Sequence, residues 1–140
     1  MIEVLMRCGA RVPEVTKWGR YYYFKHAAVA RYLLEHGMDA KHRSWQEVTL
    51  LHDMSHEGSV EKARLLLDHG AEVNALDGEY RSTPLGFAAR WNQREVALLL
   101  IERGADVNRA GADWARPVAW ARRKGHAEMV ELLRANGAAG

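Results

Sequence analysis

The sequence is poor in cysteine and has no apolar run long enough to cross a membrane. Its single cysteine, Cys8, cannot form a disulfide within the chain, and a lone thiol is typical of proteins kept in a reducing cytosol. The longest purely apolar run, Val96 to Ile101, is far shorter than the roughly 20 residues that a membrane-spanning helix needs. Residues 1–12 also lack the pattern of a secretion signal. These absences indicate a cytoplasmic protein without a membrane segment.

The chain also has little excess of charge of either sign. Lys and Arg number 20 and Asp and Glu number 18, which leaves a formal net charge of +2. A protein that binds nucleic acid by neutralising phosphates usually has a stronger basic excess, so this balance disfavours nucleic acid as a partner. No serine or cysteine stands in a recognisable nucleophile motif, and no glycine-rich phosphate loop is present. We therefore expect no enzyme activity and no cofactor.

What the chain does have is a repeated unit, seen best in residues 77–108. In this unit Thr83 can cap a helix with its hydroxyl, and Pro84 suits the first helical position. Asn92 then turns the chain into a second helix, whose apolar residues fall mainly on one face until Gly104 ends it. Neither helix can bury its apolar face alone, so the unit needs neighbours of the same kind.

The glycines that end the second helices recur at a nearly constant spacing. Gly9, Gly37, Gly70, Gly104 and Gly137 are separated by 28, 33, 34 and 33 residues. Self-similarity at such a period is the sequence signature of a repeat architecture, in which units stack in a row. The spacing therefore predicts an array of helix pairs rather than an ordinary globular domain.

A period of about 33 residues combined with a Thr-Pro-Leu-His motif is the ankyrin signature. Here the motif reads Thr-Pro-Leu-Gly from Thr83 and Thr-Leu-Leu-His from Thr49, and the last copy, which begins at Arg116, has lost its threonine. The chain resembles the ankyrin-repeat family over almost its full length. The resemblance implies an all-α solenoid of helix-turn-helix pairs joined by β-hairpin-like loops.

We expect a single domain over residues 1–140, with four units after an N-terminal half-unit. The predicted parts are a half repeat over 1–12, a degenerate repeat over 13–44, repeats over 45–76 and 77–109, and a polar C-terminal capping repeat over 110–140. Because a bare half-unit shields its neighbour poorly, we expect the chain to be a fragment of a longer array or of a multidomain protein.

Two histidines four residues apart, His52 and His56, raise the hypothesis of a metal site, because such a pair lies on one helical face. The structural alternative follows from the resemblance. It places His52 on the motif's histidine, whose side chain is expected to bond Thr49 and hold the start of the helix, and it places His56 at an exposed position. Since no third and fourth ligand accompany the pair, we expect no metal site.

The resemblance also implies where a partner binds: at the hairpin tips, at the exposed end of each first helix, and just before each stop glycine. The candidate partner-binding residues are Trp45, Gln46, His56, Glu57, His69, Glu79, Tyr80, Arg90, Trp91, Arg103, Asp113, Trp114, Arg123 and Lys124. The same mapping places Ser82 at a hairpin tip. Trp, Tyr and Arg dominate binding hot spots. An alternative for Tyr80 and Trp91 is that they only pack on one another or on long side chains, while Trp120 aligns with core positions.

These features favour a non-catalytic protein–protein interaction module that binds another protein through its concave surface and hairpin loops. The alternative is a targeting or regulatory segment of a larger enzyme or effector, with the catalytic part outside this chain. A weaker possibility is a site for an acidic small molecule or nucleic acid near Arg116 to Lys124. We expect a monomer unless the N-terminal half-unit pairs with a second copy.

Overall fold

The computed structural model describes residues 26–44 and 46–139. Within them the chain forms seven α-helices and one short 3-10 helix. They are α3 (Ala27–Glu35), α4 (Leu50–Glu57), α5 (Val60–Asp68), α6 (Pro84–Arg90), α7 (Arg94–Glu102), η1 (Asp113–Ala115), α8 (Pro117–Arg123) and α9 (Ala127–Ala135). The part of the chain so described contains no strand. The predicted half-unit at 1–12 and residue Trp45 lie outside these residues.

The helices begin where the sequence predicts. The Thr49 hydroxyl accepts a hydrogen bond from the backbone N–H of His52, while the ring of His52 accepts one from the backbone N–H of Thr49, so each satisfies a free donor of the other. At α6 the Thr83 hydroxyl accepts a hydrogen bond from the backbone N–H of Gly86, and Pro84 stands in the first turn. Arg116, which stands where the threonine is lost, makes no side-chain cap bond to α8.

The second helices end at the glycines that mark the period. Gly37, Gly70, Gly104 and Gly137 all have positive φ, between 91° and 102°. A side chain with a Cβ is disfavoured in this left-handed region, which glycine enters freely. The regular spacing of these residues therefore reflects a repeated need for a left-handed stop.

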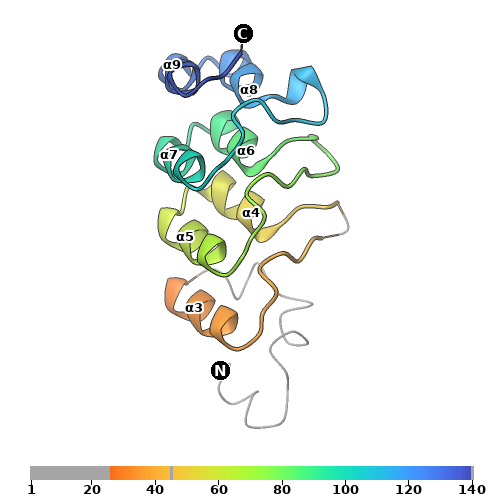
Figure 1. Cartoon of the computed structure of the whole chain (residues 1–140), viewed down its shortest axis with the longest axis vertical. Coiled ribbons are helices and arrows are strands. Elements are labelled where there is room, and N and C mark those ends of the chain that lie inside the picture. Colours follow the sequence, from red (N-terminus) through yellow and green to blue (C-terminus); the bar gives the residue numbers. More distant parts are fainter. Residues whose placement is uncertain (1–25, 45, 140) are drawn as a thin grey trace.

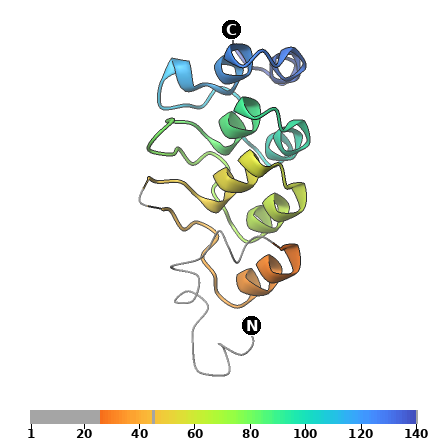
Figure 2. The same cartoon turned by 180° about the vertical axis from the view of Figure 1, so that it is seen from behind.

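The helix pairs stack in a row along the long axis of the molecule (Figure 1). The first helices of successive units, α4, α6 and α8, pack side by side in one row, and α3, α5 and α7 form a second row beside it. The connecting loops extend from the side of the first row, as the view from behind also shows (Figure 2). Each unit thus uses its neighbours to cover the faces that its own two helices leave open.

Adjacent loops are bonded directly to one another. The backbone N–H of Gly78 donates to the carbonyl of Gln46, and that of Gly111 donates to the carbonyl of Arg81, both at 2.8 Å. A Cβ at Gly78 would lie 2.9 Å from the Gln46 oxygen, so the close approach requires glycine. These bonds fix each hairpin against the preceding one.

The core is a column of leucines running between the two helix rows. Its fully buried members include Leu33, Leu51, Leu66, Leu85, Leu100 and Leu133, each at 0% exposure. Trp120 is also buried, as its alignment with core positions predicts. No helix in the described part of the chain combines the length and apolarity that a membrane crossing requires. The predicted all-α solenoid is confirmed.

Candidate functional site

Rings and guanidinium groups from three units form a continuous line over α4, α6 and α8. We call this line the aromatic–arginine strip, and its members are His56, Tyr80, Arg90, Trp91, Trp114, Trp120 and Arg123. Six of the seven were predicted as partner-binding residues, and Trp120 was predicted as core. The helix repeat explains the line, because equivalent positions of stacked units lie next to one another.

Arg90 is the centre of the strip. Its guanidinium carbon lies 4.3 Å from the ring centre of Tyr80, 4.7 Å from that of Trp91 and 4.5 Å from that of Trp120. Each of these distances is within the range of a cation–π contact. The three rings come from a hairpin loop, from the end of α6 and from α8, so their positions depend on two different units.

Arg123 and Trp114 extend the strip into the last unit. The Arg123 guanidinium lies 4.4 Å from the ring centre of Trp120 and donates a hydrogen bond to the backbone carbonyl of Trp114. The ring of Trp114 meets that of Trp120 edge to face at 6.2 Å and is 48% exposed. Trp120 is therefore covered by side chains of the strip, while about half of the surface of Trp114 is exposed to solvent.

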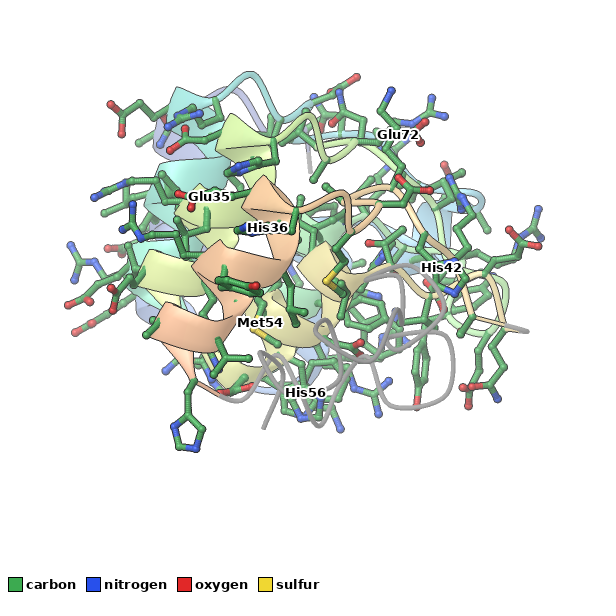
Figure 3. All side chains as sticks on the ribbon, turned by 90° about the horizontal axis from the view of Figure 1, so that it is seen from below. Glu35, His36, His42, Met54, His56 and Glu72 are labelled. Carbon is green, nitrogen blue, oxygen red and sulfur yellow. The ribbon has the colours of Figure 1, made fainter. Side chains whose placement is uncertain are left out.

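At the other end of the strip, His56 stacks on Trp91 with ring centres 3.8 Å apart. The side chain of Gln93 donates to the His56 carbonyl at 2.9 Å, which holds the end of α4 near the turn after α6. Partial burial lowers the pKa of His56, and the positive charge of Arg90 lowers it further. Looking along the stack, His56 lies on the opposite side of the molecule from Glu72 (Figure 3).

Ser82 lies beneath the strip and is fully buried, so its predicted place at an exposed hairpin tip is wrong. Its hydroxyl accepts from the Trp120 indole N–H at 2.7 Å and donates to the Ala115 carbonyl at 2.9 Å. Its backbone carbonyl accepts from His52 Nε2 at 3.0 Å. Ser82 thereby connects three successive units and positions the ring of Trp120.

Asp77 holds the hairpin that presents Tyr80. The buried carboxylate accepts hydrogen bonds from the backbone N–H groups of Glu79, Tyr80 and Ser82, at 2.7 to 3.0 Å. The Tyr80 ring also meets Phe87 edge to face at 5.8 Å and Trp91 at 6.4 Å. Tyr80 and Trp91 thus pack on their neighbours, as the structural alternative predicts, while both remain partly exposed.

The other predicted surface residues have contacts outside the strip. Arg103 pairs with Asp68 at 2.6 Å and His69 bonds the Leu65 carbonyl, both at the ends of second helices. Glu57 pairs with the buried Lys62, and Asp113 with Arg116. Gln46 and Glu79 lie in the hairpins and Lys124 at the exposed end of α8.

The described residues include no group of three or more His, Cys, Asp or Glu placed to hold a metal ion. His52 instead serves the fold, because Thr49 lies 2.8 Å from its Nδ1 and the Ser82 carbonyl 3.0 Å from its Nε2. The Thr49 backbone N–H donates to Nδ1, which places the ring proton on Nε2. The expected bond between Thr49 and His52 is confirmed.

Comparison with known proteins agrees with this architecture. The family model of ankyrin repeats, in three copies, matches residues 21–111. The palmitoyltransferase Hip14 of Drosophila melanogaster is 39% identical over 82 residues, which are 58% of this chain and 13% of that protein. The human ARF GTPase-activating protein GIT1 is 36% identical over 97 residues, 69% of this chain and 12% of that protein. The chain spans only about an eighth of the length of these relatives. It belongs to the ankyrin-repeat family.

Proposed function

We propose that this chain is a non-catalytic module that binds another protein through the aromatic–arginine strip. Ankyrin repeats are protein-interaction modules, and the observation that supports this site is the continuity of the strip across three units. A line of rings and guanidinium groups offers both apolar area and directed donors, the combination found at binding hot spots.

The strip is suited to binding because its side chains are already held in place. Arg90 is packed on three rings, and the Trp120 ring is fixed by its bond to Ser82. Ordering a long side chain on association costs roughly 0.5–1.5 kcal/mol, so groups ordered in the free protein spare the complex that cost. The side-chain conformations along α6 and α8 should therefore differ little between the free protein and the complex.

Two exposed apolar side chains allow a matched test. Trp114 is 48% exposed on the strip, and Leu98 is 45% exposed on α7, which belongs to the second row. Trp114→Ala should weaken binding of the partner at least about tenfold, because it removes apolar area from the interface. Leu98→Ala should leave binding unchanged. The measurement is affinity capture from an extract of the source organism, followed by titration of the captured protein.

Both variants should melt within a few degrees of the wild type, because each side chain is half exposed. If Trp114→Ala and Leu98→Ala weaken binding of the partner equally, the interface lies outside the strip. Tyr80 and Trp91 are poorer choices for this test, since their packing on Phe87 makes a loss of stability inseparable from a loss of contact.

A second proposal is that the module is the recognition segment of a longer protein, located in the cytoplasm. The supporting observation is that the chain matches only a small fraction of the length of each relative, 12% of GIT1 and 13% of Hip14. Sequencing the transcript on both sides of the region that encodes this chain tests the proposal. A reading frame that extends into a further domain supports it, and stop codons at both ends contradict it.

A further inference from the structure

The two arginines of the strip have no acidic partner in the described part of the chain. Arg90 makes only ring contacts through its side chain, and Arg123 adds a single bond to the Trp114 carbonyl. Glu57, the acidic residue of α4 among the predicted surface positions, is engaged with Lys62 at 2.8 Å. The strip therefore presents two positive charges that the described residues leave without a counter-charge.

The guanidinium of Arg90 is also short of hydrogen-bond acceptors. Its Nη1 is buried and has no partner. No acceptor among the described residues takes its other N–H groups, which are not enclosed, because Arg90 as a whole is partly exposed. Ionised donors form the stronger class of hydrogen bond, and a carboxylate matches the planar guanidinium with two parallel bonds. Arg90 is thus a fixed donor that lacks an acceptor.

Arg90 and Arg123 both pack on the ring of Trp120. Their guanidinium carbons are 4.5 Å and 4.4 Å from the centre of the same ring, that of Trp120. Neighbouring carboxylates on one segment can therefore contact both. The exposed ring of Trp114 lies beside them and can receive an apolar side chain of that segment.

We propose that the partner's contact segment is acidic, and that it places Asp or Glu carboxylates on Arg90 and Arg123 with an apolar side chain on Trp114. This proposal rests on the proposed function, because it names the chemistry of the partner at the same strip. The observations that carry it are the absence of a counter-charge among the described residues, the accessible N–H groups of Arg90 that have no acceptor there, and the shared ring of Trp120.

The test selects peptides from a phage-displayed random library on the folded protein. We expect the enriched peptides to share an acidic position. Replacing that Asp or Glu by Asn or Gln should weaken binding about tenfold or more, as should Arg90→Gln and Arg123→Gln in the protein. The matched control is Arg94→Gln. Arg94 of α7 forms an exposed pair with Glu128 of α9. Its replacement changes the net charge equally, so the affinity for the peptide should stay unchanged.

The outcomes separate this proposal from the proposed function. Enriched peptides without an acidic position, or equal weakening by Arg94→Gln, contradict the acidic partner while leaving protein binding intact. Failure to enrich any peptide contradicts both. Rings and arginines also suit single-stranded nucleic acid, so fluorescent oligothymidine is titrated in parallel. Oligothymidine binding that Arg90→Gln removes would assign the strip to nucleic acid. The peptide-side substitution remains informative even if an arginine variant folds poorly.

Discussion

Ser82→Ala should lower the free energy of unfolding by about 2–4 kcal/mol, although it removes a single oxygen atom. The hydroxyl of this residue serves two buried groups of the next unit, the indole N–H of Trp120 and the carbonyl of Ala115. Without it both groups remain buried and unpaired, and each such group costs about 1–3 kcal/mol. Urea denaturation followed by tryptophan fluorescence and by circular dichroism measures the change.

Ser55→Ala is the matched control. Ser55 is buried as completely as Ser82, but its hydroxyl donates only to the Leu51 carbonyl one turn earlier in α4. Since that carbonyl also lies within a helix and alanine is the better helix former, this variant should change stability by less than about 1 kcal/mol. Similar losses in the two variants would show that the bonds between units do not carry the stability assigned to them.

The second large effect is a loss of stability in acid that depends on His52. Burial lowers the pKa of His52 from 6.5 to about 4 in the folded protein. Between these values the unfolded chain binds a proton that the folded chain does not, so stability falls as pH falls. The contribution is fully present above about pH 6.5 and lost by about pH 4, and the loss amounts to roughly 3 kcal/mol.

His52→Gln isolates this contribution, because glutamine places a neutral amide at the site that does not titrate. We expect the variant to be less stable than the wild type at pH 7, since the bonds to Thr49 and Ser82 are disturbed. The difference in the free energy of unfolding between the wild type and the variant should shrink steadily from pH 6.5 to pH 4. A difference that stays constant with pH would mean that His52 has the same pKa in the folded and unfolded chains, contrary to its burial.

Much of the fold is readable from the sequence because its signals are local. A threonine before an apolar turn, as at Thr83, and a glycine at the stop, as at Gly104, each act within a few residues of the helix end they define. The period then follows from repetition of these local signals. Residues 1–25, which include the predicted half-unit, lie outside the described residues.

The strip was only partly predictable, because its chemistry arises between units. Trp120 aligns with core positions and is buried, yet one ring serves as the support for both arginines. Ser82 sits at a loop position that is exposed in the family pattern, but a bond from a residue 38 positions later draws it inside. Neither relation is visible in one repeat, since each requires the neighbouring unit to be stacked in place.

The central claim is that Arg90 and Arg123 receive the partner while the second helix row does not. The most direct measurement is the nuclear magnetic resonance spectrum of the arginine side-chain N–H groups during titration with an enriched acidic peptide. We expect the signals of Arg90 and Arg123 to shift and those of Arg94 and Arg103, which have acidic partners on the second helices, to stay in place. Shifts at Arg94 or Arg103, with Arg90 and Arg123 unchanged, would contradict it.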